Sequence, residues 1–227
     1  MQTAQRIIYY YRRRRFILCI ILAVITLLLT LGLRYLTERN DYRREIAGYH
    51  QRAIASLESV LEPIDIARKS LAALPGISCD MAQYQLREQA ARLQTVRSIG
   101  LVKDGILYCS SIFGQRDIAI NKLQPSLPSV APLMQLSTAN SLLIGSPILL
   151  LWEPSSADGQ SGVVQIINIE LLTALTLQPG PPLIQKAVLN VANHYLVDKK
   201  IIWSALPHTP GQVEHRFHSQ RYPLAIV

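Results

Sequence analysis

Two cysteines outside the apolar N-terminal segment offer the most reactive chemistry in this sequence. Cys79 lies in the stretch GISCDM, and Cys109 lies in DGILYCSSIFG, 30 positions further along the chain. In an oxidising compartment such a pair forms a disulfide by default, which would stabilise the fold by about 3.5–4 kcal/mol in the chain-entropy model. Two free thiols are the alternative. Cys19 lies within the apolar segment, where a small apolar residue is the plain interpretation and acylation or pairing between chains are the alternatives.

Other site chemistries find little support in the sequence. A metal site needs three or four ligands, and the two cysteines could be joined only by histidines that folding brings near, namely His194, His208, His215 and His218. A cysteine nucleophile would need a histidine partner and an oxyanion hole, which no motif indicates. The serine-hydrolase patterns G-x-S-x-G and S-x-x-K and the phosphate-binding glycine loops do not occur. We therefore assign no catalytic residue, no metal and no cofactor.

The positive charge of the chain is concentrated at its N-terminal end. The 227 residues carry a formal net charge of +8. Residues 1–44 hold nine arginines and two acidic residues, whereas the rest of the chain holds 14 basic and 13 acidic residues. The part of the chain that could form a globular domain is thus nearly neutral, so the sequence does not predict nucleic-acid binding.

The arginine cluster borders an apolar segment of membrane-spanning length. Phe16 to Leu33 is a run of 18 uncharged, mostly apolar residues that Tyr35 and Leu36 can extend. As a helix it crosses most of the ~30 Å hydrocarbon core of a bilayer. A buried core helix is the alternative, although the four consecutive arginines fit poorly beside a soluble core. The sequence predicts a transmembrane helix over residues 16–36.

The distribution of arginines favours one orientation of this helix. Arg12, Arg13, Arg14 and Arg15 form a dense block at its N-terminal edge, and the arginines on the other side are more widely spaced. By the positive-inside rule, residues 1–15 are expected in the cytoplasm and residues 37–227 outside it. The stretch TLGLRYL offers no small-x-small cleavage site, so we expect an uncleaved anchor.

Helical patterns follow the apolar segment. An apolar stripe at helical spacing runs along residues 36–74 and comprises Ile46, Tyr49, Ala53, Leu57, Val60, Leu61 and Ile64. The stripe suits packing in the core of the domain, and a homodimer seam is the alternative. Pro63 is expected to kink or break this helix, and Pro75-Gly76 to end it. A second helix is predicted over residues 80–96.

The rest of the chain has the patterns of strands and turns. Asp104-Gly105 between apolar stretches predicts a hairpin with a type I′ turn, which places Cys109 on its second strand. Further strands are predicted over residues 141–154 and 163–172, and hairpins over 187–204 and 213–227, with loops at 123–133 and 155–162. Helices followed by successive strands indicate an α+β domain with an antiparallel sheet, which resembles PAS-like and Cache-like sensor domains.

These residues together resemble a known family. A cysteine about 30 positions before LVKDGILYCSSIFG, after an N-terminal anchor, is similar to the CSS-motif domain, the extracytoplasmic region of bacterial cyclic di-GMP phosphodiesterases. The triplet that names the family is here Cys109-Ser110-Ser111. The resemblance implies a redox-sensitive disulfide between Cys79 and Cys109, oxidised when the phosphodiesterase is restrained and reduced when it is active. It also implies periplasmic thiol–disulfide oxidoreductases as partners and a place in the bacterial inner membrane.

The chain departs from the family pattern in one respect. Family members continue into a second membrane helix and a cytoplasmic EAL domain, and this sequence has no Glu-Ala-Leu triplet and no second apolar run of membrane length. We therefore expect a regulatory region without catalysis of its own, as a fragment, a separate sensor or a truncated product. A ligand-binding sensor with a purely structural disulfide, and an envelope assembly protein, are the alternatives. Ser110 and Ser111 could bond to nearby backbone or serve only as polar residues at a strand end.

Overall fold

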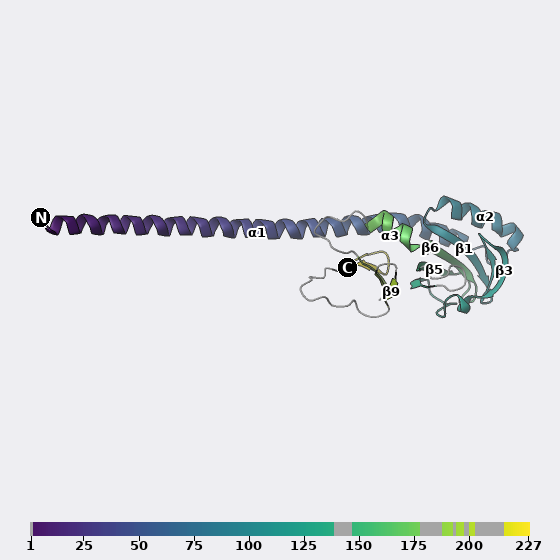
Figure 1. Ribbon diagram of the computed structural model, residues 1–227. Coiled ribbons are helices and arrows are strands. Elements are labelled where there is room, and N and C mark those ends of the chain that lie inside the picture. The colour runs from purple at the N-terminus through teal and green to yellow at the C-terminus, as the bar shows by residue number, and fades with distance from the viewer. Residues whose placement is uncertain (1, 139–146, 178–187, 193, 198–199, 203–215) are drawn as a thin grey trace. The chain divides into compact units, whose positions relative to one another are not determined.

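The computed structural model describes residues 2–138, 147–177, 188–192, 194–197, 200–202 and 216–227 (Figure 1). The chain forms two compact units, Met1–Gly48 and Tyr49–Val227. Helix α1 (Gln2–Leu71) supplies all the described residues of the first unit and the opening segment of the second.

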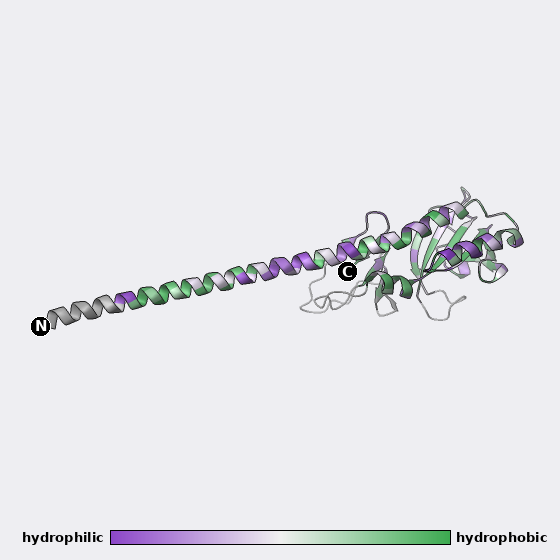
Figure 2. Ribbon diagram, turned by 90° about the horizontal axis from the view of Figure 1, so that it is seen from above, coloured by the Kyte–Doolittle hydropathy of each residue, from purple (hydrophilic) through white to green (hydrophobic). Residues whose placement is uncertain are grey.

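The first unit contains the apolar segment. Between Arg14 and Leu71, helix α1 contains an 18-residue window that is apolar enough to cross a membrane, and none of that window is buried. Figure 2 shows its apolar turns in green, followed by a polar stretch in purple. The Thr26 and Thr30 hydroxyls donate to the carbonyls of Ala23 and Leu27, which satisfies them within the helix. The predicted span, residues 16–36, lies between these bounds, and all of its residues are exposed.

The second unit contains two antiparallel sheets. The order of strands in the larger sheet, sheet A, is β3 (Gly114–Ala119), β2 (Ile106–Ser110), β1 (Val96–Lys103), β6 (Gly162–Asn168), β5 (Ile148–Pro154) and β4 (Leu133–Ser137). The order in the smaller sheet, sheet B, is β10 (Phe217–His218), β11 (Leu224–Ile226), β7 (Leu189–Val191), β8 (His194–Val197) and β9 (Lys200–Ile202). Every pairing of neighbouring strands is antiparallel.

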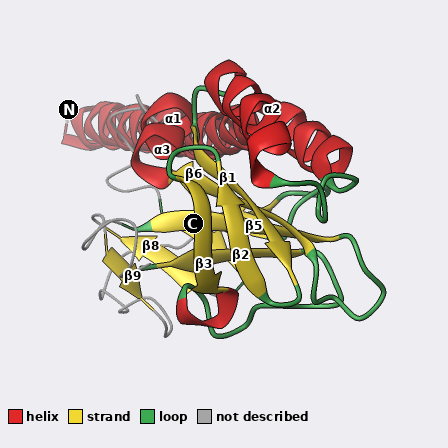
Figure 3. Cartoon of the chain, turned by 90° about the vertical axis from the view of Figure 1, so that its right-hand side faces the viewer, coloured by secondary structure: helices red, strands yellow, loops and turns green. Residues whose placement is uncertain are grey.

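Helices cover one face of sheet A. Helix α2 (Cys79–Arg92) packs across β1, β2 and β3, and helix α3 (Ile169–Leu177) follows β6 directly. A 3₁₀ turn, η1 (Ile120–Lys122), follows β3. Figure 3 shows the helices on one side of the strands. The predicted α+β class with an antiparallel sheet is confirmed.

The two faces of sheet A carry two separate apolar clusters. Alternate residues of β5 point to opposite faces: Leu149 and Leu151 belong to the cluster with the helices, and Leu150 and Trp152 to the cluster with η1. The second cluster is closed by apolar residues of the 120–127 segment, Ile120, Leu123 and Leu127. The Trp152 indole donates to the Ser129 carbonyl at 2.8 Å, which satisfies its polar atom.

The apolar stripe of α1 packs in the core of the second unit. Leu57, Leu61 and Ile64 are at most 1% exposed and belong to the cluster on the helix side of sheet A. The core-packing interpretation of the stripe is therefore confirmed. The predicted break at Pro63 does not occur, since α1 runs through it to Leu71. Pro63 lies on the exposed side of the helix, between the buried residues Leu61 and Ile64.

The predicted hairpin is present with the predicted turn. β1 and β2 pair on either side of Asp104 and Gly105, whose φ angles are 53° and 73°. The chain end also forms the predicted hairpin, β10 with β11. β7 pairs with β8 within the range predicted for the other hairpin.

Two predicted boundaries were wrong, and two strands were missed. The segment 163–172 is not one strand, because Asn168 ends β6 and its side chain accepts hydrogen bonds from the amides of Glu170 and Leu171, which starts α3. The second helix ends at Arg92, and Val96 already belongs to β1. Strands β3 and β4 were not predicted. Residues 141–146 of a predicted strand, and parts of the hairpin ranges 187–204 and 213–227, lie outside the described residues.

Candidate functional site

The two cysteines of the sequence prediction are joined. Cys79, the first residue of α2, and Cys109, in β2, form a disulfide with a Cα–Cα distance of 5.2 Å. Cys79 is 8% exposed and Cys109 is not exposed. The third cysteine, Cys19, has a free thiol on the exposed surface of α1.

Local structure directs both cysteines toward each other. In the β1–β2 hairpin Cys109 lies opposite Leu101, and both belong to the apolar cluster on the helix side of sheet A. Cys79, Ala82 and Leu86 form the buried stripe of α2, at spacings of three and four residues. The disulfide is therefore part of the packed layer between α2 and the sheet.

Ser111 connects the same elements by hydrogen bonds. Its hydroxyl accepts a bond from the Ile99 amide at 3.0 Å, and its own amide donates to the Ile99 carbonyl at 2.8 Å. Its carbonyl accepts a bond from the Arg87 Nε of α2 at 3.0 Å. Ser111 thus extends the β1–β2 pairing by one residue beyond the strand and joins it to α2. Ser110 is buried in β2, where it pairs with Gly100 and Gly114.

The residue before Cys109 holds the turn before Cys79. The Tyr108 hydroxyl accepts a bond from the Gly76 amide and donates to the Ile77 carbonyl, both at 3.0 Å. Burial raises the pKa of Tyr108, which keeps the phenol protonated as a donor at neutral pH. The turn between α1 and α2 is therefore attached to β2 by a disulfide and by the adjacent tyrosine. No sequence pattern indicated this tyrosine beyond its place next to the cysteine.

A buried charge cluster, which sequence analysis missed, ties α1 to β5. Arg68 pairs with Asp65 on the same helix and lies 3.3 Å from a Glu153 carboxylate oxygen, while its guanidinium donates to the Trp152 carbonyl at 3.1 Å. Burial opposes ionisation of Asp65 most strongly, but Lys69 and Arg68 together outweigh it and lower the pKa of the carboxyl. The only sequence signal was the spacing of Asp65 and Arg68, three residues apart on a helix.

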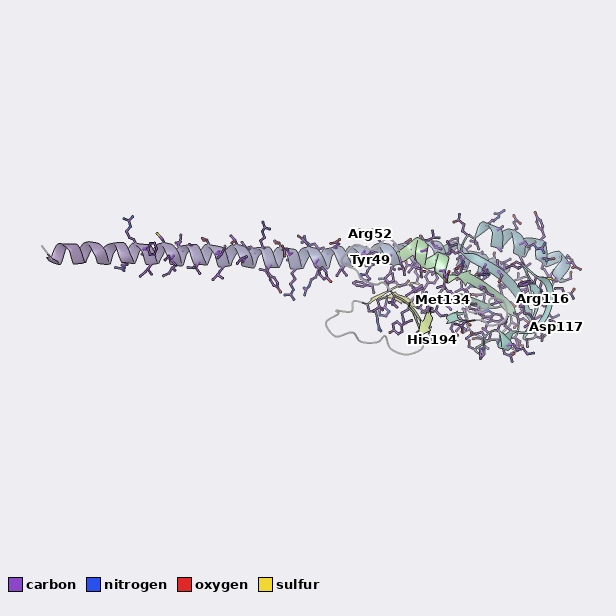
Figure 4. The ribbon with its side chains drawn as sticks, in the orientation of Figure 1. Tyr49, Arg52, Arg116, Asp117, Met134 and His194 are labelled. Atoms are coloured by element: carbon purple, nitrogen blue, oxygen red, sulfur yellow. A yellow bond between two sulfur atoms is a disulfide. The ribbon has the colours of Figure 1, made fainter. Side chains whose placement is uncertain are left out.

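Apolar side chains are exposed beside both cysteines. Met81 and Tyr84 lie on the outer side of α2, 75% and 77% exposed, and Ile112 and Phe113 follow the triplet. Arg116 of β3 lies over the Phe113 ring at 4.8 Å. Figure 4 labels Arg116 and its neighbour Asp117.

The described residues support disulfide chemistry rather than a metal site. In that part of the chain, no group of three His, Cys, Asp or Glu residues could hold a metal ion. His194 lies in β8 and His218 in β10, while His208 and His215 fall outside the described residues. Arg12, Arg13, Arg14 and Arg15 all belong to α1, and the last two are exposed.

Comparisons with known proteins agree with this arrangement. The family described as "CSS motif domain associated with EAL" matches residues 43–227. "Probable cyclic di-GMP phosphodiesterase PdeD" of Escherichia coli (strain K12) is 42% identical over 226 residues, which cover 100% of this chain and 42% of that protein. "Probable cyclic di-GMP phosphodiesterase PdeN" of the same organism is 30% identical over 99 residues, 43% of this chain and 19% of that protein. The chain thus spans less than half the length of these curated relatives.

A solved structure shows the same fold. The extracellular domain of the putative histidine kinase rpHK1S-Z16 aligns with a TM-score of 0.56 at 15% identity, over 83% of this chain and 93% of that one. At this identity the likeness concerns the fold alone. It agrees with the predicted α+β fold with an antiparallel sheet.

Proposed function

The chain belongs to the family of CSS motif domains associated with EAL, and from this we propose that it is the membrane-anchored, periplasmic sensor region of a cyclic di-GMP phosphodiesterase. In this proposal the region is regulatory and does not itself hydrolyse the nucleotide. Hydrolysis belongs to an EAL domain of the kind that the family description names. The curated relative that is 42% identical is described as a probable phosphodiesterase of this nucleotide.

The observation that carries the proposal is the position of the Cys79–Cys109 disulfide. It joins the first residue of α2 to β2, and α1 ends only eight positions earlier, at Leu71. Reduction would release the start of α2 from the sheet and loosen the turn that links the two helices. Because α1 also contains the proposed membrane span, the thiol state has a route along one helix toward the cytoplasm.

The charge distribution supports the proposed sidedness. Residues 1–15 would lie in the cytoplasm, 16–36 in the inner membrane and 37–227 in the periplasm, in accordance with the arginine block at Arg12–Arg15. In the periplasm a disulfide can form and persist, and thiol–disulfide oxidoreductases of that compartment are the expected partners.

Thiol trapping in cells tests the redox role. Alkylation of free thiols in cells with and without periplasmic oxidases should yield both oxidised and reduced forms of the Cys79–Cys109 pair. The Cys19→Ser background removes the third thiol from the measurement. A pair that stays oxidised under every growth condition would contradict redox sensing and leave the disulfide with a structural role.

A chimera tests the regulatory output. The matched region of the 42% identical E. coli relative would be replaced by this chain, with and without Cys79→Ser and Cys109→Ser. We expect cyclic di-GMP hydrolysis to rise when the disulfide cannot form. Equal hydrolysis by both chimeras, at equal membrane abundance, would refute control by this disulfide.

A further inference from the structure

The two sulfurs of the disulfide sit in unequal surroundings. Cys79 lies at the start of a helix, and its neighbours in the chain, Ser78 and Asp80, are both exposed. Cys109 is fully buried in β2, which pairs with β1 on one side and β3 on the other. A helix end opens locally at little cost, whereas exposing a strand paired on both sides requires most of the domain to open.

The first turn of α2 has few attachments of its own. Ser78 at the N-cap makes no side-chain capping bond, and its carbonyl accepts the amides of Met81 and Ala82. Beyond the disulfide, the preceding turn is held to β2 by the Tyr108 hydroxyl, bonded to the Gly76 amide and the Ile77 carbonyl. The Tyr108 hydroxyl also lies 3.5 Å from the Leu74 carbonyl. Release of these contacts would detach the segment before Cys79 from β2 while the strand pairing of sheet A stays intact.

We infer that Cys79 is the sulfur that an incoming thiol attacks. We also infer that the hydrogen bonds of the Tyr108 hydroxyl act as a latch, meaning that they must break before Cys79 becomes accessible. This inference rests on the proposed redox role of the pair and names the site of its modification. The reactant is a dithiol, such as the reduced cysteine pair of an oxidoreductase. Tyr108 acts through the turn and is a positioning residue rather than a reacting one.

The exchange proceeds in two balanced steps. A thiolate of the dithiol attacks the Cys79 Sγ, the bond between Cys79 and Cys109 breaks, and the electron pair leaves on the Cys109 sulfur, which takes a proton. The second thiolate of the reactant then attacks its own sulfur in the mixed disulfide, releasing reduced Cys79 and an oxidised reactant. Two electrons pass from the dithiol to the pair.

The leaving groups favour the opposite order, but by a smaller factor. Attack at Cys109 would release the Cys79 thiolate at a helix N-terminus, which stabilises the departing anion and would speed the exchange by about tenfold. Access to Cys109 requires an opening that folded domains populate to only about one part in a thousand or less. Access therefore decides the site of attack.

Adduct mapping on the full chain in detergent tests the site. The oxidised Cys19→Ser protein is exposed to glutathione, quenched with acid, alkylated and analysed by peptide mass spectrometry. We expect glutathione on Cys79 and the alkyl label on Cys109.

A second experiment applies if the Cys79–Cys109 disulfide re-forms too fast for an adduct to persist. It uses the single-cysteine variants Cys109→Ser and Cys79→Ser. With glutathione disulfide, the free Cys79 of the former should react at least about tenfold faster than the free Cys109 of the latter. Adducts mainly on Cys109, or equal reaction at both sites, would overturn the inference.

Tyr108→Phe tests the latch, with Tyr49→Phe as the matched control. Each change removes one hydrogen-bonded tyrosine hydroxyl, and that of Tyr49 donates to the Leu177 carbonyl at 2.6 Å, away from the disulfide. We expect Tyr108→Phe to speed reduction by dithiothreitol by roughly fivefold and Tyr49→Phe to leave it near the wild-type rate. Equal rates for wild type and Tyr108→Phe, or equal acceleration by both variants, would exclude a latch. These measurements use purified protein, so they hold or fail independently of whether cells ever reduce the pair.

Discussion

At the scale of single residues, two members of the triplet and the tyrosine before it have separate tasks. Cys109 forms the covalent link to α2, Ser111 continues the β1–β2 pairing, and Tyr108 holds the turn before α2. Tyr108 thus attaches the turn between α1 and α2 to the sheet, and Ser111 attaches α2 itself. The motif and Tyr108 together form a joint that links α2 and the turn before it to the sheet around one reducible bond.

Replacement of Ser111 should weaken this joint measurably. Ser111→Ala leaves the buried Ile99 amide without its acceptor, so we expect a loss of about 1–3 kcal/mol in the free energy of unfolding. Ser59→Ala is the control, because that hydroxyl bonds only to the Ser56 carbonyl of its own exposed helix surface. Urea denaturation of the oxidised proteins measures both. Equal stability of the two variants would show that Ser111 is merely a polar strand end.

The buried charge cluster gives a pH-dependent prediction. Asp65→Asn removes a partner of Arg68 while Glu153 still faces the guanidinium, and we expect a loss of about 1–3 kcal/mol at pH 7. Because the Asp65 pKa is lowered in the folded state, its stabilisation is present above the usual carboxyl pKa of 3.8 and is lost as the pH falls through the lower value.

The stability difference between wild type and Asp65→Asn should therefore narrow below about pH 4. Urea denaturation at a series of pH values measures this difference. Glu88→Gln is the control, since its ion pair with Arg92 is exposed and its replacement should change stability little. A difference that stays constant down to acid pH would mean that the carboxylate charge is not what stabilises the fold.

At the scale of elements, α1 has a buried stripe and an exposed side within the second unit. Leu57→Ala leaves a cavity in the core, and we expect it to reduce stability by about 2–5 kcal/mol. Ile66→Ala, on the same helix but 63% exposed, should have little effect. Thermal and urea unfolding compare the two variants. A Leu57 variant that keeps its stability but loses self-association would instead support a dimer seam.

Sequence patterns predicted the elements whose signals are local. The apolar segment, the stripe of α1 and the Asp104-Gly105 turn each depend on residues within one element, and the disulfide followed from compartment and spacing. β3 was missed because its exposed Gln115, Arg116 and Asp117 carry no apolar alternation. The end of β6 was misplaced because the Asn168 cap was hidden in an apolar run. The Arg68 and Tyr108 contacts join residues 84 and 32 positions apart, which no local pattern encodes.

At the scale of the whole molecule, the proposed redox role of the disulfide depends on the membrane orientation that the arginine block is proposed to set. The proposed role of Cys79 and Cys109 requires the second unit to lie in an oxidising compartment, and the proposed orientation places it there through the N-terminal charges. A second unit retained in the cytoplasm would keep the pair reduced.

Removal of the N-terminal charges should redirect part of the population. With Arg12, Arg13, Arg14 and Arg15 all changed to Ser, the remaining arginines lie mostly on the C-terminal side of the span, so we expect a lower fraction of chains with that side outside. Alkaline phosphatase fused after Val227, which is active only outside the cytoplasm, should lose activity, and the oxidised fraction of Cys79–Cys109 should fall in parallel. Changing Arg43 and Arg44 to Ser is the matched control and should leave both readouts high. If phosphatase activity fell while the oxidised fraction stayed high, orientation and disulfide formation would be uncoupled, and the arginine block would have no part in setting the thiol state.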